Sequence, residues 1–478
     1  MSSLFQKSTA VSILVATAFF MENLDGTVIA TALPQMGKSF HVSPVDLNIG
    51  MTAYLLMLAV FIPISGWVAD KVGARSVFVS AIAVFTFASI LCGLSNGIVA
   101  FTSARILQGI GGAMMVPVGR LVVLRTTEKS RLMEAIAYIT WPALVAPVVG
   151  PPVGGYITTY FSWHWIFYLN VPLGIVGIAL SLLWIPNLKE DKVRAFDWIG
   201  FVLSSTACVT FMYGMELVGR EDTSWRSPSL YLACGGVLAV LAVMHLRRSP
   251  TPLLKLDLLK IKTFAITIEG GSLFRASISV SPFLLPLMFQ VGFGLSAFQS
   301  GMFMLGLFAG NLSMKPATTF MLRRFGFRSV LIWNGVLTAI LMLGCSLLFP
   351  STPRTIILAV LFVNGLCRSM QFTCLSTLSF ADVPKPDLSS ATSFFSMITQ
   401  MSMGMGVAVG AIALRAAGLL DGNAHGTPTT KEFHIAFLFV AALTLIGTID
   451  CFSLEPDAGA AVTGHRLPPV QEKASAAT

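Results

Sequence analysis

Charged residues are scarce in this chain, and their scarcity sets its class. Asp, Glu, Lys and Arg make up 11% of the 478 residues, whereas hydrophobic residues make up 55%. The mean hydropathy is +0.79. A soluble domain carries about 25% charged residues, so the composition excludes an ordinary soluble protein. It predicts an all-α polytopic membrane protein in a lipid bilayer. The net charge of +9 does not indicate nucleic acid, because the basic residues are distributed among the loops.

Metal-binding and disulfide patterns are also missing from the sequence. The seven cysteines form no CxxC pair and lie mostly within apolar runs, so we interpret them as packing residues. The sequence shows no cluster of a nucleophile with a base, and none of metal ligands, so an enzyme is the weakest class of function. We therefore expect no metal and no cofactor.

What the chain has instead is long hydrophobic runs. Fourteen of them fall near residues 11–33, 48–69, 76–96, 101–123, 134–158, 163–185, 197–217, 228–246, 264–290, 297–321, 329–349, 355–380, 392–416 and 434–453. A transmembrane helix needs roughly 20 apolar residues, so the runs predict fourteen transmembrane helices. Most Lys and Arg outside them lie in segments on the side of the N-terminus, which predicts that both termini are cytoplasmic.

A short internal repeat divides the chain. Residues 71–77 recur at 324–330, with Gly, Arg, Ser and Val at matching positions. Both copies lie after the second span of a half, as expected of a transporter built from two repeated halves. We predict a six-helix bundle at 1–190, two inserted transmembrane helices with linkers at 191–255 and a second six-helix bundle at 256–455. The polar segment 456–478 is predicted to be a disordered cytoplasmic tail.

Two acids lie inside the first apolar run. Glu22 and Asp25 are three residues apart, so both point to one side of the helix. A carboxylate at membrane depth costs about 2.5 kcal/mol or more, and such residues often carry protons or ions.

The segment around these acids resembles a known family. Residues 21–34 resemble the first-helix motif M-x-x-L-D-x-T-[IV]-x-x-x-A-L-P of the fourteen-helix drug:proton antiporters of the major facilitator superfamily. Residues 162–172 resemble the S-W-x-W-I-F-x-I-N-x-P signature of the same branch, and residues 112–121 resemble the MdtD-type exporters within it. The resemblance implies the major facilitator fold, with two six-helix bundles and two inserted helices.

Further motifs of this family supply site residues. Residues 104–113 resemble R-x-x-Q-G-x-G-x-A, in which Arg105 needs a counter-charge that Asp25 or Glu22 can supply. We predict proton coupling by Asp25, Glu22 and Arg105; a static ion pair that only joins two helices is the alternative. Residues 66–75 resemble a conformational latch made of Gly66, Asp70, Lys71, Gly73 and Arg75, although Ala74 replaces a usual basic residue.

The direction of transport is indicated by a motif in the fifth span. Gly150, Pro151, Gly154 and Gly155 resemble the antiporter motif G-P-x-x-G-G, which marks exporters rather than symporters in the family. Paired glycines allow helices to pack closely, and proline kinks a helix.

The family fold also predicts which charged residues line the substrate cavity. We place Gln108, Glu269, Arg275 and Arg368 there, together with the acids of the first helix. With two arginines on the second bundle's cavity helices, the set suits an anionic or zwitterionic substrate.

We interpret the chain as a proton-coupled exporter of small molecules that works by alternating access. It would be driven by the proton gradient in a bacterial inner membrane, and a need for accessory efflux subunits stays open. An exporter of an organic anion or metabolite such as a carboxylate is the alternative. An importer of the same fold and a membrane sensor that does not transport are more remote.

Overall fold

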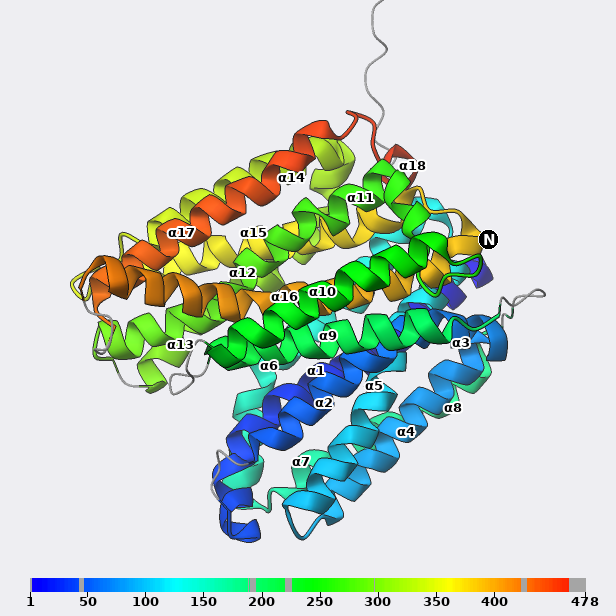
Figure 1. The fold of residues 1–478 in the computed structure, drawn as a ribbon, viewed down its shortest axis with the longest axis horizontal. Coiled ribbons are helices and arrows are strands. Elements are labelled where there is room, and N and C mark those ends of the chain that lie inside the picture. The colour runs from blue at the N-terminus through cyan, green and yellow to red at the C-terminus, as the bar shows by residue number, and fades with distance from the viewer. Residues whose placement is uncertain are drawn as a thin grey trace, which may run out of the picture.

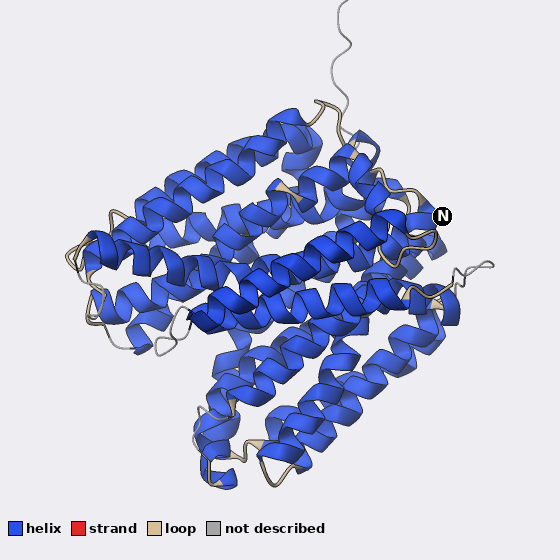
Figure 2. Ribbon diagram, in the orientation of Figure 1, coloured by secondary structure: helices blue, strands red, loops and turns tan. Residues whose placement is uncertain are grey.

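The computed structural model describes residues 2–42, 47–187, 189, 195–219, 226–295, 297–422 and 428–463. Within these ranges every regular element is a helix (Figure 2). The all-α prediction is confirmed, and the protein is an integral membrane protein.

The first group of helices holds residues 2–184. It comprises α1 (Ser2–Phe40), α2 (Asn48–Phe61), α3 (Ser65–Val72), α4 (Ala74–Leu94), α5 (Ile98–Thr126), α6 (Leu132–Tyr160), α7 (His164–Tyr168) and α8 (Asn170–Trp184). A single 3-10 turn joins α2 to α3, so the two act as one span. The tightest packing is of α1 on α6 and of α4 on α5. We call this group the N bundle.

The second group holds residues 262–449, and we call it the C bundle. It comprises α11 (Lys262–Ile268), α12 (Gly270–Leu287), a π-helical turn (Met288–Gly292), α13 (Ala297–Ser313), α14 (Lys315–Cys345), α15 (Arg354–Ala381), α16 (Leu388–Leu420) and α17 (Thr430–Ile449). Short 3-10 helices cover Lys129–Arg131, Leu256–Lys260, Lys385–Asp387 and Asp450–Ser453.

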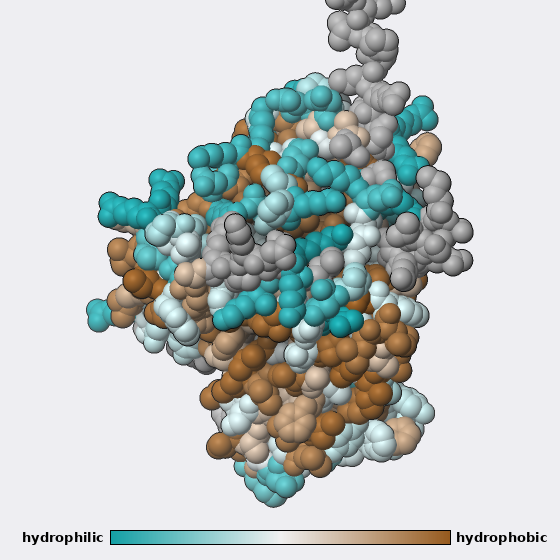
Figure 3. Space-filling model, turned by 90° about the vertical axis from the view of Figure 1, so that its right-hand side faces the viewer, coloured by the Kyte–Doolittle hydropathy of each residue, from teal (hydrophilic) through white to brown (hydrophobic). Residues whose placement is uncertain are grey.

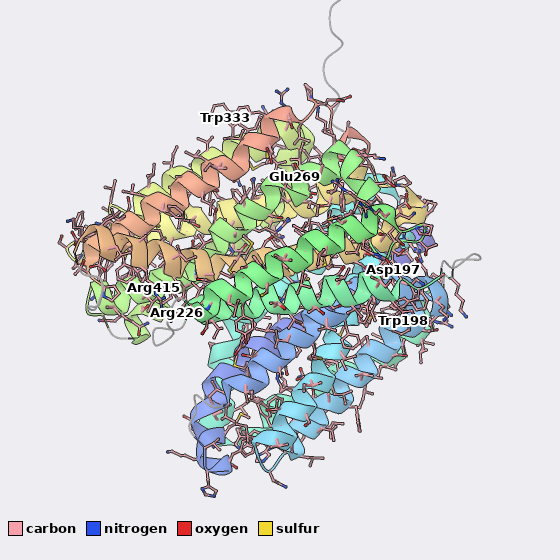
Figure 4. The ribbon with its side chains drawn as sticks, in the orientation of Figure 1. Asp197, Trp198, Arg226, Glu269, Trp333 and Arg415 are labelled. Carbon is pink, nitrogen blue, oxygen red and sulfur yellow. The ribbon has the colours of Figure 1, made fainter. Side chains whose placement is uncertain are left out.

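Between the bundles lie α9 (Trp198–Gly219) and α10 (Arg226–Arg248), which pack on each other. α9 contacts α2 of the N bundle and α16 of the C bundle. The Ser205 hydroxyl donates to the Val60 carbonyl at 2.7 Å. At the start of α9, Asp197 accepts hydrogen bonds from the Gly200 and Leu253 amides and contacts His245 (Figure 4). This pair of helices therefore bridges the two bundles.

The sequence repeat corresponds to a repeated turn in the structure. Gly73, between α3 and α4, has φ 102° and ψ 134°, and Gly326, inside α14, has φ 72° and ψ 167°. Both positions lie in the left-handed region that favours glycine. α14 is thus two helices joined at Gly326, just as α3 and α4 are joined at Gly73.

The count of spans differs from the prediction. Twelve helices in the described part are long and apolar enough to cross a membrane. Two expected spans, 134–158 and 297–321, correspond to the helices α6 and α13, which are not among the twelve. α13 has 17 residues, and α14 counts once although Gly326 divides it. The count of fourteen therefore stays a prediction.

The two bundles meet at one end of the molecule. The N-terminus, α3 and α11 lie at that end, and the bundles diverge from it towards α7 and α13 (Figure 1). Seen from that end, hydrophilic residues spread across the surface and hydrophobic residues cover the flank below them (Figure 3). We call it the latch end.

The tail is ordered further than the sequence predicted. α18 (Ala460–Thr463) lies within the segment expected to be disordered, and Val462 is buried. Gly459 adopts φ 70° against the ring of Phe327, so apolar packing on α14 extends the fold to residue 463. Residues 464–478 lie outside the described part.

Candidate functional site

Asp25 is the centre of a buried polar network inside the N bundle. Its Oδ2 accepts from Arg105 Nη1 at 2.6 Å, and its Oδ1 accepts from Gln108 Nε2 at 3.0 Å and from Asn170 Nδ2 at 2.9 Å. Ser89 Oγ accepts from the same Gln108 and Asn170 amides at 2.9 and 3.3 Å. The network therefore joins α1, α4, α5 and α8. Both Asp25 oxygens only accept, which is the bonding pattern of an ionised carboxylate.

Arg105 is held from several sides. Its Nη1 also donates to Gln108 Oε1 at 2.5 Å, and its guanidinium lies 4.4 Å from the ring centroid of Tyr54 on α2. Arg105 and Asp25 are 1% and 4% exposed. The sequence left Asp25 or Glu22 as the counter-charge of Arg105, and the structure shows Asp25. Gln108 was predicted to line the substrate cavity, but it is fully buried in this network.

Sequence reasoning missed two members of this network. Asn170 lies in the segment 162–172 that resembles the signature of the family branch, and Ser89 lies in no motif. A single sequence does not indicate which neutral polar residues of different helices contact each other. The contacts of Asn170 and Ser89 in this network are therefore visible only in the structure.

Glu22 is separate from the network although it is one turn from Asp25. It is half-buried, and its Oε2 has no hydrogen-bond partner among the described residues. Tyr54 neighbours both Glu22 and Arg105. Glu22 is therefore a second carboxylate on α1 that takes no part in the hydrogen bonds of the Asp25 network.

The latch motif joins the two bundles at the latch end. Asp70 accepts from Arg125 Nη2 at 2.8 Å and from the Ser389 hydroxyl of α16 at 2.5 Å. The Gly66 amide donates to Ser393 Oγ at 2.8 Å. α3 of the N bundle is thus fastened to α16 of the C bundle.

The other latch residues take supporting positions. Lys71 lies over the Trp67 ring at 4.7 Å from its centroid, and Arg75 is half-buried at the start of α4. Gly73 packs against Asn187, where a Cβ would overlap the side-chain amide. Ala74 is buried, so the position where the family has a basic residue makes no polar contact here.

Substituting Gly66 tests this latch. A Cβ at Gly66 would overlap the Ser389 carbonyl, so α3 and α16 cannot approach as closely in a Gly66→Val variant. We expect the rate of cargo exchange in proteoliposomes to fall about tenfold or more, because raising the barrier of the conformational change by about 1.4 kcal/mol slows it tenfold.

The control for this test is Gly97→Val. Gly97 has extended backbone, and no other atom lies within 4 Å of the place that a Cβ would take, so exchange and Tm should stay unchanged. Normal exchange by a Gly66→Val protein of native Tm would show that this contact does not take part in the cycle.

The antiporter motif lies on α6 against the helix that carries Asp25. A Cβ at Gly150 would overlap Thr27 on α1, so glycine permits this contact. Thr27 Oγ1 donates to the Ala146 carbonyl at 3.5 Å. The Gly154 and Gly155 carbonyls accept from the Thr158 hydroxyl. The side chain of Pro151 lies outside the described part of the structure.

The predicted charges of the second bundle do not form one group. Glu269 is exposed at the break between α11 and α12 (Figure 4). Its φ of −78° and ψ of −88° interrupt the helix, so Glu269 does not share a continuous helix face with Arg275, although the family fold predicted both in the cavity. Arg368 is half-buried and donates to the Ile278 carbonyl at 2.7 Å. Arg275 instead donates to the Thr267 carbonyl at 2.8 Å.

Arg120 is a charged residue that the sequence prediction did not assign to a site. It lies on α5, and its guanidinium is 4.9 Å from the ring centroid of Phe395 on α16. The Arg275 guanidinium lies 5.2 Å from the same centroid. Arg275 therefore lies near Arg120 of the other bundle, on the shared Phe395 ring, and not beside Glu269. No group of three or more His, Cys, Asp or Glu in the described part is placed to hold a metal ion.

Comparison with known proteins agrees with this arrangement. The model of the family described as Major Facilitator Superfamily matches residues 15–277 and 270–473. The "Putative multidrug resistance protein MdtD" of Escherichia coli O6:H1 is 35% identical over 436 residues, which cover 90% of this chain and 91% of that protein. The protein of the same name from Citrobacter koseri is 37% identical, with 89% of each chain covered.

Two solved structures share the fold. The human organic anion transporter MFSD10 matches with a TM-score of 0.66 and 14% identity, over 93% of this chain and 99% of that chain. The proton:xylose symporter XylE matches with a TM-score of 0.64 and 13% identity, over 96% and 97% of the two chains. At these identities the similarity concerns the fold alone.

Proposed function

Because the chain belongs to the major facilitator superfamily, whose members are membrane transporters, we propose that it is a proton-coupled exporter of small molecules. The observation that carries the proposal is the buried Asp25–Arg105 pair, in which Gln108 bonds both partners and Asn170 bonds Asp25. An ion pair at this depth is costly to keep without a function, and breaking one costs about 3–5 kcal/mol.

Protonation of Asp25 would change this network in a defined way. A neutral carboxyl no longer compensates the charge of Arg105, and its O–H must donate where the carboxylate accepted. Arg105 then loses its ion pair and keeps Gln108 Oε1 as its side-chain acceptor. Because the network spans four helices of the N bundle, such a change repacks the bundle that faces the cargo. Proton binding and bundle movement are thereby linked.

Alternating access fits the contacts at the latch end. The latch closes that end, where the bundles meet. With the N-terminus in the cytoplasm, as the distribution of Lys and Arg predicts, this is a state that opens to the outside. The cycle would load cargo from the cytoplasm and take up protons from outside. The membrane would be the bacterial inner membrane.

Export rather than import is favoured by the close contact of Gly150 with Thr27, two residues from Asp25. This contact packs α6 tightly against the helix that carries the proton site. The two MdtD relatives, named as multidrug resistance proteins, favour the same direction. The proton gradient would be the only energy source, and no cofactor is proposed.

The test is transport in everted membrane vesicles energised by an acid interior. We expect uptake of at least one compound from a panel of lipophilic cations and organic anions, and we expect a protonophore to abolish it. Uptake that survives the protonophore would contradict proton coupling. Binding without any uptake or counterflow would instead support a membrane sensor.

A further inference from the structure

We propose that Arg120, Arg275 and Phe395 form an anion-binding site that spans the two bundles, and that the cargo is a small organic dianion. The inference rests on the proposed export function and names the class of its cargo. We call these three residues the arginine site.

The site is built from opposite sides of the transporter. Arg120 comes from α5 of the N bundle, whereas Arg275 and Phe395 come from α12 and α16 of the C bundle. Both guanidinium groups lie on the Phe395 ring, which is fully buried. Arg120 also donates to Ser396 Oγ at 3.2 Å, across the same interface.

The two positive charges lack a counter-ion. Neither Arg120 nor Arg275 makes an ion pair with any carboxylate of the described residues. Arg275 is 1% exposed, yet its Nε and Nη1 have no hydrogen-bond partner there. Buried charges are normally paired, and two cations against one ring repel each other. A bound anion would compensate both charges and use the unbonded N–H groups.

A structural role explains only part of Arg275. Its Nη2 donates to the Thr267 carbonyl and the Ser272 hydroxyl, which flank the helix break at Glu269. This contact stabilises the break, but Nε and Nη1 take no part in it. It also does not explain why Arg120 of the other bundle meets the same ring.

Arg368 belongs to a different level of the C bundle. It donates to the Ile278 carbonyl, whereas Arg275 donates to the Thr267 carbonyl. At 1.5 Å per helical residue, these two carbonyls are roughly 16 Å apart along the axis. Arg368, which lies on α15, is therefore not part of the arginine site.

The chemistry of the pair selects the cargo. A guanidinium matches carboxylate and phosphate oxygens with two parallel hydrogen bonds. Two guanidinium groups are neutralised by two negative charges, so a dicarboxylate or a phosphate dianion fits better than a monoanion. A lipophilic cation is repelled.

The site also supplies a reason for the bundles to move. When the latch end closes, Arg120 approaches Arg275. An anion that is already bound by one arginine then contacts the other arginine as well. After the anion leaves to the other side, two uncompensated charges face each other and favour reopening. Cargo binding and release thus bias opposite steps of the cycle.

The experiment is counterflow of labelled succinate and of inorganic phosphate in proteoliposomes without a pH gradient. Wild-type protein should exchange at least one of them. Arg120→Gln and Arg275→Gln should each raise the half-saturating concentration about tenfold or more, because a charge-assisted hydrogen bond is lost. The exposed Arg247 of α10 gives the control variant Arg247→Gln, which should exchange like wild type.

Tetraphenylphosphonium serves as the opposite cargo. Wild-type exchange of this cation with no exchange of either anion would overturn the proposal, as would unchanged anion exchange by both arginine variants. Arg275→Gln also loses a hydrogen bond to the backbone, so the Tm of both arginine variants is measured. If Arg275→Gln does not fold, the exchange by Arg120→Gln decides the test. If the anions exchange but a pH gradient does not drive their uptake, proton coupling is contradicted and the arginine site is still supported.

Discussion

Asp25→Asn is expected to abolish export driven by a proton gradient while cargo counterflow stays measurable. Asparagine keeps the size of the side chain and can still bond Gln108 or Asn170, but it neither carries a proton nor compensates Arg105. Gradient-driven uptake into everted vesicles should fall about 100-fold or more, which is the lower range of what a positioned proton-transfer group contributes.

Glu22→Gln is the matched control for this variant. Glu22 is half-buried one turn away and makes no ion pair among the described residues, so its loss should reduce uptake far less. Normal gradient-driven uptake by Asp25→Asn protein with a native Tm would move the proton role to Glu22.

Arg105→Lys is the second variant with a large expected effect. One Arg105 nitrogen bonds both Asp25 and Gln108, and the planar guanidinium lies on the Tyr54 ring. An ammonium keeps the charge, but it cannot lie flat on the Tyr54 ring while it bonds both acceptors. We expect gradient-driven uptake to fall roughly 10- to 100-fold, as for the loss of one or two charge-assisted hydrogen bonds.

Two measurements interpret this variant. Tm reports whether the buried pair still holds the N bundle together, and gradient-driven uptake reports coupling. Loss of uptake at a native Tm supports a positioning role for Arg105. Near-full uptake by Arg105→Lys would instead leave Arg105 as a static partner of Asp25, which was the alternative that the sequence left open.

Local motifs made much of this architecture predictable from the sequence. Gly73 and Gly326 were marked by the repeat because a turn of positive φ needs glycine, and such a need leaves a signature in a short segment. A pairing of Arg105 with an acid of the first helix was predictable because a charge at membrane depth requires a partner, but the sequence did not choose between Asp25 and Glu22.

Other features depend on the fold and were not predictable. The family fold predicted Glu269 in the cavity, but Glu269 is a non-helical residue between α11 and α12 and is exposed at that break. Asn170 reaches Asp25 through the packing of α8 on α1. Arg120 and Phe395 meet only because α5 and α16 close on each other, which is a property of one conformation.

The most direct test of the account is the luminal pH of everted vesicles while cargo enters. The vesicles are acidified inside, a trapped pH dye is read, and succinate or tetraphenylphosphonium is added. The account predicts that a transported probe raises the luminal pH in wild-type vesicles and has no effect with Asp25→Asn. Cargo entry with no change of luminal pH, or an equal response from Asp25→Asn, would contradict it.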